Sequence, residues 1–69
     1  MEFIEKAKIR IEHWITHNDH HQEEYEMFAE QLEREGLDKS AALIKEMVGL
    51  NAKSTSCLKE ALKALEEKG

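Results

Sequence analysis

The stretch Glu35-Gly36-Leu37-Asp38 decides the fold, because it is the one strong break in a chain that otherwise favours helix. Glycine at position 36 can adopt the left-handed conformation that ends a helix. Asp38 can then accept hydrogen bonds from the free amides at the start of the next helix. The stretch predicts a turn at residues 35–38, between a first helix over about residues 2–34 and a second over about residues 38–67.

Composition on both sides of this turn favours helix. The 69 residues include no proline, Gly36 and Gly49 are the only interior glycines, and alanine, leucine, glutamate and lysine are frequent. These four residue types are strong helix formers, whereas an interior proline would break a helix. A chain of this length has room for one domain. We therefore expect residues 1–69 to form a single all-α domain, an antiparallel two-helix hairpin.

A seven-residue repeat of apolar residues runs through both predicted helices, as expected for helices that pack lengthwise. In the first helix its two positions hold Ile4, Ile11, Asn18, Tyr25 and Leu32, and Ala7, Trp14, His21 and Phe28. In the second helix they hold Leu37, Ile44, Asn51, Leu58 and Leu65, and Ala41, Val48, Thr55 and Leu62. The repeat predicts an apolar seam between the helices, with Trp14, Tyr25 and Phe28 in the core.

Polar residues interrupt this seam near the middle of each helix. In an antiparallel hairpin that turns at Gly36, residues face each other when their numbers add up to about 72. This relation places Asn18 and His21 opposite Asn51 and Thr55. The sequence therefore predicts one buried polar layer, shared by both helices and formed by Asn18, His21, Asn51 and Thr55.

A second apolar stripe lies beside the seam of the second predicted helix. It consists of Leu43, Met47, Leu50, Ser54, Cys57 and Ala61, which follow helical spacing. A lone hairpin cannot cover two stripes on one helix, so we expect two copies to dimerise into a four-helix bundle. In that bundle Cys57 would be a buried structural thiol. The alternative is that the stripe is ordinary surface, because much of any protein surface is apolar.

All four histidines lie in the middle of the first predicted helix, at positions 13, 17, 20 and 21. His17 precedes His21 by four residues, a spacing that puts two imidazoles on adjacent helical turns where they can bind one metal ion. We expect His17 and His21 to be the main ligands, with Glu24 next. His20 and His13 face mostly toward solvent and come after these. Such a set suits nickel or zinc.

Two hypotheses about function follow from these residues. In the first, the chain is a small cytoplasmic metal-binding protein for metal handling or sensing, and its histidine cluster lies at a dimeric bundle. In the second, it is a metal-independent homodimeric interaction module. Buried histidine and asparagine side chains in helical bundles often serve only to set register and oligomeric state.

Several other classes of function are not expected. The formal net charge is −5 without a basic patch, so we expect no nucleic-acid partner. No apolar run is long enough for a membrane span. Cys57 is the single cysteine, which fits a reducing cytoplasm. A phosphate-binding glycine loop is missing, and no serine or cysteine nucleophile stands beside a histidine in sequence, so we do not expect an enzyme.

The segment His17-Asn18-Asp19-His20-His21, an HNxxH pattern, is followed by Tyr25, Ala29, a glycine turn and Asn51. Over residues 12–65 the chain resembles a family of small, poorly characterised helical-hairpin domains from anaerobic microbes. The resemblance implies a helical hairpin and carries no established activity. It is strongest at residues that already interrupt the apolar seam.

Overall fold

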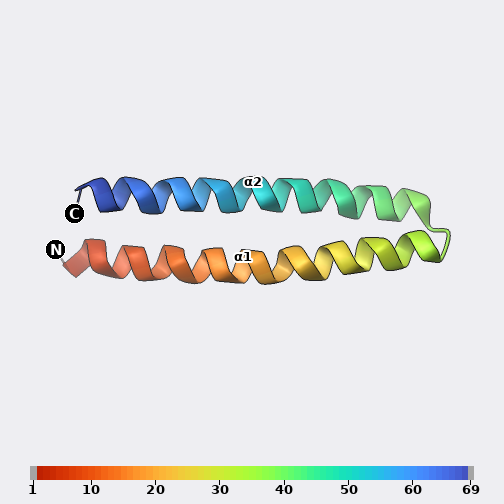
Figure 1. The fold of residues 1–69 in the computed structure, drawn as a ribbon, viewed down its shortest axis with the longest axis horizontal. Coiled ribbons are helices and arrows are strands. Elements are labelled where there is room, and N and C mark those ends of the chain that lie inside the picture. Colours follow the sequence, from red (N-terminus) through yellow and green to blue (C-terminus); the bar gives the residue numbers. More distant parts are fainter. Residues whose placement is uncertain (1, 69) are drawn as a thin grey trace.

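The computed structural model describes residues 2–68, which form two long antiparallel helices (Figure 1). Helix α1 spans Glu2–Arg34 and helix α2 spans Asp38–Lys68. Within residues 2–68 no strand occurs. The structure confirms the predicted all-α hairpin, and the predicted helix ends agree with it to within one residue. The beginning of α1 and the end of α2 lie together at the end of the hairpin opposite the turn.

The turn between the helices forms where the glycine predicted it. Gly36 has a φ of 78°, in the left-handed region that other residues rarely adopt. The amide of Leu37 donates to the carbonyl of Leu32 over 2.9 Å, so that the last turn of α1 is closed by a Schellman-type bond. The carbonyl of Leu37 accepts from the amide of Ala41, which makes Asp38 the first residue inside α2. There its charge complements the helix dipole.

The helices meet through small residues. Ala29 of α1 is 2% exposed and Ala41 of α2 is 1% exposed, and among the described residues no large side chain is fully buried. The hairpin measures 53 × 14 × 11 Å, and its radius of gyration is 15.8 Å. A compact domain of this length would have a radius of gyration of about 11 Å. The molecule is therefore a thin rod with little core of its own.

The expected position of the aromatic residues in this core was wrong for two of the three. Trp14 is 47% exposed and Phe28 is 50% exposed, whereas Tyr25 is half-buried. Cys57 is exposed in the single chain, and its burial in a dimeric bundle stays a prediction. The seven-residue repeat marks a stripe wider than one partner helix can cover, so residues at its edge stay outside when a single hairpin forms.

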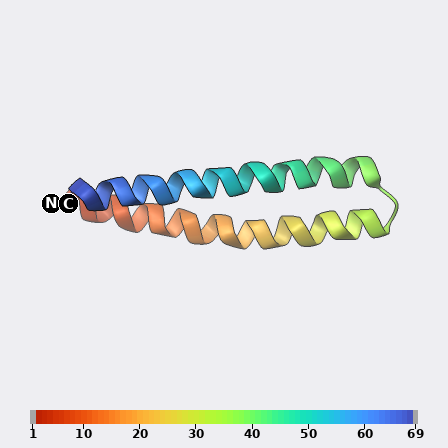
Figure 2. The ribbon, with the colours of Figure 1, turned by 45° about the horizontal axis from the view of Figure 1, so that its top comes forward.

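One side of the hairpin is apolar across both helices. A shallow groove near the turn is lined by residues of both, namely Phe28, Leu32, Ser40, Leu43 and Ile44. Other apolar residues at helical spacing from these lie on the same side of the rod. We call it the apolar face and define it by its exposed large side chains: Phe3, Trp14, Phe28, Leu43, Met47 and Leu50. The helices stay side by side along the rod when the view is turned (Figure 2).

The opposite side carries charge instead. There Lys45 of α2 forms an ion pair with Glu33 of α1. A shallow hollow beside this pair is lined by Glu26, Ala29, Glu30, Lys45 and Val48. We call this side the charged face. The two faces of one hairpin therefore differ in character although the same two helices form both.

Candidate metal-binding site

His17 and His21 face each other on adjacent turns of α1. Their Nε2 atoms lie 2.8 Å apart, and their ring centroids are 4.4 Å apart with the planes at 83°. The regular helix over Glu2–Arg34 sets this arrangement, because residues four apart lie one above the other on its surface. The structure thus brings together the two histidines that the sequence ranked first.

Glu24 holds the other side of the His21 ring. Its Oε1 lies 3.1 Å from His21 Nδ1, while His17 is on the Nε2 side. The carboxylate therefore does not reach the gap between the two Nε2 atoms, where the sequence interpretation had it as a further ligand. A carboxylate in this position orients the imidazole, as carboxylates do behind metal-bound histidines.

The chemistry of this pair follows from the two contacts. When both rings are neutral, His21 Nδ1–H donates to Glu24, so His21 Nε2 carries a lone pair and His17 Nε2–H donates to it. A metal ion could bind both Nε2 atoms once the His17 proton is carried on its Nδ1 instead, so that each Nε2 presents a lone pair. Two imidazoles at 2.0–2.1 Å from one ion have nitrogens about 2.9 to 3.4 Å apart, for angles from square to tetrahedral. Little movement of the two rings would be required.

The other two histidines take less part in the arrangement. The His13 ring is stacked on His17 at a centroid distance of 6.2 Å, and the Tyr25 ring is stacked on His21 at 5.5 Å. His20 is exposed. Within residues 2–68 no three histidine, cysteine, aspartate or glutamate side chains converge on one point. We therefore describe His17 and His21, with Glu24 behind them, as a half-site.

The polar layer between the helices is built around Asn51. Its Nδ2 donates to the Asn18 carbonyl over 3.0 Å and to Gln22 Oε1 over 2.8 Å, and the hydroxyl of buried Thr55 donates to the Asn51 carbonyl. His21 lies outside this layer, although the sequence interpretation had included it. It follows Asn18 by three residues, which turns it about 60° away from α2.

Sequence reasoning missed Gln22, which completes the layer. Gln22 lies four residues after Asn18 on the same side of α1, so both can meet one side chain of α2. An asparagine at a seam position needs several partners when it is buried, because its amide group has two donor hydrogens. A search for a second polar residue one turn from Asn18 would have found Gln22.

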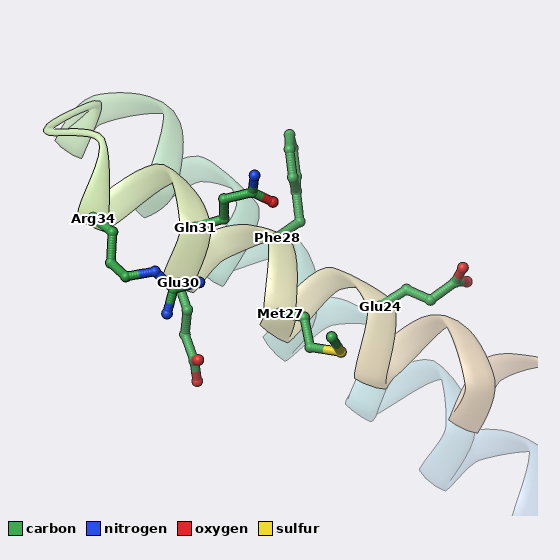
Figure 3. Close-up of a pocket in the computed structure, with 6 residues that line it drawn as sticks. All are labelled: Glu24, Met27, Phe28, Glu30, Gln31 and Arg34. Atoms are coloured by element: carbon green, nitrogen blue, oxygen red, sulfur yellow. The ribbon is translucent and has the colours of Figure 1, made fainter.

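The surface near the half-site is open. A hollow one turn further along α1 is lined by residues of α1 alone: Glu24, Met27, Phe28, Glu30, Gln31 and Arg34 (Figure 3). The Phe28 ring projects away from the helix there. Side chains of a single convex helix leave such a hollow exposed to solvent. It does not enclose a small molecule as ligand-binding clefts do.

A family model described as Domain of unknown function (DUF8180) matches residues 7–65. The chain belongs to this family. The match spans the turn and most of both helices, including the half-site and the Asn51 layer of this DUF8180 domain. It confirms the expectation of a small, poorly characterised domain family, whereas the link to anaerobic microbes stays a prediction. No curated protein and no solved structure matches the chain.

Within residues 2–68, neither helix of the DUF8180 domain combines the length and apolar character that crossing a membrane requires. Both helices are interrupted by charged residues at short intervals.

Proposed function

We propose that this chain is a small, non-catalytic cytoplasmic protein that binds a divalent transition-metal ion for metal handling or sensing. The observation that carries the proposal is the 2.8 Å approach of His17 Nε2 to His21 Nε2, with Glu24 bonded to the far nitrogen of His21. Imidazole ligands suit nickel and zinc, and the carboxylate supports the tautomer that a metal-bound His21 needs.

Metal binding is tested by calorimetric titration of the tag-free protein with NiCl2 and with ZnCl2. We expect binding tighter than about 100 μM, equivalent to about 5.5 kcal/mol. The double variant His17→Ala/His21→Ala should abolish it. The matched control His13→Ala/His20→Ala removes two histidines from the same helix and should retain it. Absence of binding, or equal binding by both double variants, would refute the proposal.

The role of Glu24 gives a finer test of the same site. Glu24→Gln removes the charge behind His21, and loss of such a partner weakens metal affinity by about 10- to 100-fold. Glu23→Gln removes the same charge from an exposed neighbouring position and should leave the affinity unchanged. If the two variants bind nickel equally well, Glu24 does not orient His21 for a metal.

A second candidate function, a metal-independent homodimeric interaction module, is favoured by the two hydrogen bonds of Asn51 across the seam. In this case the polar layer sets the register of the helices at a cost in stability. The double variant Asn18→Leu/Asn51→Leu should then melt at a higher temperature and form a mixture of oligomers in sedimentation. A lower melting temperature would exclude register setting as the role of the layer.

A further inference from the structure

The isolated hairpin exposes more surface than a folded domain of its size. Its accessible area is 5561 Å² for a mass of 8.0 kDa. The general relation between mass and area gives about 4,450 Å² for that mass, so the excess is about 1,100 Å². A stable protein–protein interface of ordinary size buries about 800 Å² on each partner. The excess surface of the whole rod is therefore comparable to one such interface, and the exposed large side chains gather on the apolar face.

Side-chain size along α2 indicates which partner fits this face. The stripe begins with large residues, Leu43, Met47 and Leu50, and continues with small ones, Ser54, Cys57 and Ala61. A second copy of α2 that runs antiparallel places each large side chain against a small one. Leu43 then lies opposite Ala61, Met47 opposite Cys57, and Leu50 opposite Ser54. The midpoint of all three pairs is position 52.

Charges at the edge of the apolar face on α1 agree with the same arrangement. Lys6 and Arg10 border this face in the N-terminal half, where they line a hollow with Phe3 and Trp14. Helical spacing places Glu35 at the same edge in the C-terminal half. A second, antiparallel copy of α1 puts Lys6, which in the single chain pairs with Glu2 over 3.2 Å, opposite Glu35, with the midpoint between positions 20 and 21.

The two midpoints lie at the same height along the rod. Asn51 is bonded to the Asn18 carbonyl and to Gln22, so position 51 of α2 is level with positions 18–22 of α1. The pattern of side-chain size along α2 and the pattern of charge along α1 thus place the midpoint between the two copies at the same height along the rod. This is also the level of the half-site, since His17 and His21 bracket position 20.

We infer that two copies pack apolar face to apolar face with their turns at opposite ends, and that the two half-sites meet at the two-fold axis. Each α1 then lies against the α1 of the second copy. His21 is half a residue from the midpoint, so the two His21 residues are separated by about 1.5 Å along the rod. The second copy supplies the ligands that a single half-site lacks. One ion is then held by imidazoles of both chains, and we call this arrangement the composite site. The composite site rests on the proposed metal binding, whereas the dimer does not.

The opposite arrangement, with both turns at the same end, fits less well. It would pack α1 of one copy against α2 of the other at the same height. Phe28 and Leu32 would then meet Leu43 and Met47, and the pairing of large with small residues along α2 would be lost. With turns at opposite ends, large side chains meet only along α1, where Trp14 lies level with Phe28 of the second copy. Close packing requires large residues to alternate with small ones across a helix interface.

Electron-spin distance measurements on the metal-free protein distinguish the two arrangements. The native thiol is removed by Cys57→Ser, and a spin label is attached to either Lys53→Cys or Lys39→Cys, both at exposed positions. Position 53 is one residue from the midpoint, and position 39 is thirteen residues away. With turns at opposite ends, the two backbones should be about 3 Å apart along the rod at position 53 and about 39 Å apart at position 39. Two short, similar distances, or no intermolecular distance at all, would overturn the inference.

Titration with NiCl2 tests the composite site separately. The expected end point is one ion for every two chains, with unchanged spin–spin distances. An end point of one ion per chain would overturn the composite site. If no nickel binds while the long and short distances are observed, the proposed metal function is refuted and the antiparallel dimer is supported. His17→Ala/His21→Ala should lose the nickel and keep both distances.

Discussion

The apolar face and the charged face belong to the same two helices but are held in different ways. On the charged face an ion pair between Lys45 and Glu33 joins the helices. On the apolar face Leu43 is 58% exposed and Leu50 is 62% exposed. Several large side chains are thus left in water on the apolar face, whereas at the contact between the helices only small residues are fully buried and the large ones, such as Ile44 and Leu58, are half-buried.

This difference shows that the hairpin alone makes little use of its own hydrophobic residues. Burial of apolar area is the main favourable contribution to folding, but the single chain buries only Ala29 and Ala41 among its apolar residues and leaves seam residues such as Ile44 and Leu58 half-buried. Small chains commonly gain the missing stability from a metal or from a partner subunit. The apolar face offers the second of these, and the half-site beside it offers the first.

The largest effect is expected from a charge on the apolar face. Leu50→Lys should abolish dimerisation and lower the free energy of unfolding by about 2 kcal/mol or more per chain, because a core leucine contributes about 2 to 5 kcal/mol. Sedimentation velocity and urea unfolding at equal protein concentration measure both effects.

Ala52→Lys is the matched control for this change. Position 52 is two residues further along α2, is exposed and points about 160° away from the main apolar stripe. This variant should remain dimeric and lose little stability. If Leu50→Lys and Ala52→Lys behave alike, the apolar face is ordinary surface and the contrast between the faces has no energetic meaning.

An intermediate effect is expected in the seam between the two faces. Asn51→Asp removes the amide hydrogens that Asn51 donates to the Asn18 carbonyl and to Gln22. Loss of such part-buried bonds costs about 1 to 3 kcal/mol, measurable by urea unfolding. Asn18→Asp should cost less, since the contact uses only the backbone of Asn18. If Asn51→Asp and Asn18→Asp lose the same free energy of unfolding, the polar layer does not depend on the donor hydrogens of Asn51.

The smallest effect is expected on the charged face. Lys45→Ala breaks the ion pair with Glu33, but the two side chains are 54% and 45% exposed. Solvent and salt screen such pairs, so the loss should stay below about 1 kcal/mol and disappear in 1 M salt. Lys45→Arg should behave like the native chain. If Lys45→Ala lowers the free energy of unfolding as much as Leu50→Lys does, the two faces do not differ in their contribution to stability.

The accuracy of the sequence predictions varied with the range of the interactions involved. The turn at Gly36 and the ends of both helices depend on local preferences, and the sequence predicted them to within one residue. The spacing of His17 and His21 is also local, because it lies within one helix. By contrast, the partners of Asn51 depend on how two helices meet, and there Gln22 was missed and His21 was wrongly included.

The sequence by itself determined that this chain is a hairpin of two helices and that four histidines share one stretch of the first. These features follow from the propensities of neighbouring residues and from the helical repeat. Only the tertiary structure decided which edge of each apolar stripe is buried, because that depends on the rotation of one helix against the other. It put Ala29 and Ala41 inside, left Trp14 and Phe28 outside, and assigned Glu24 to the far side of the His21 ring.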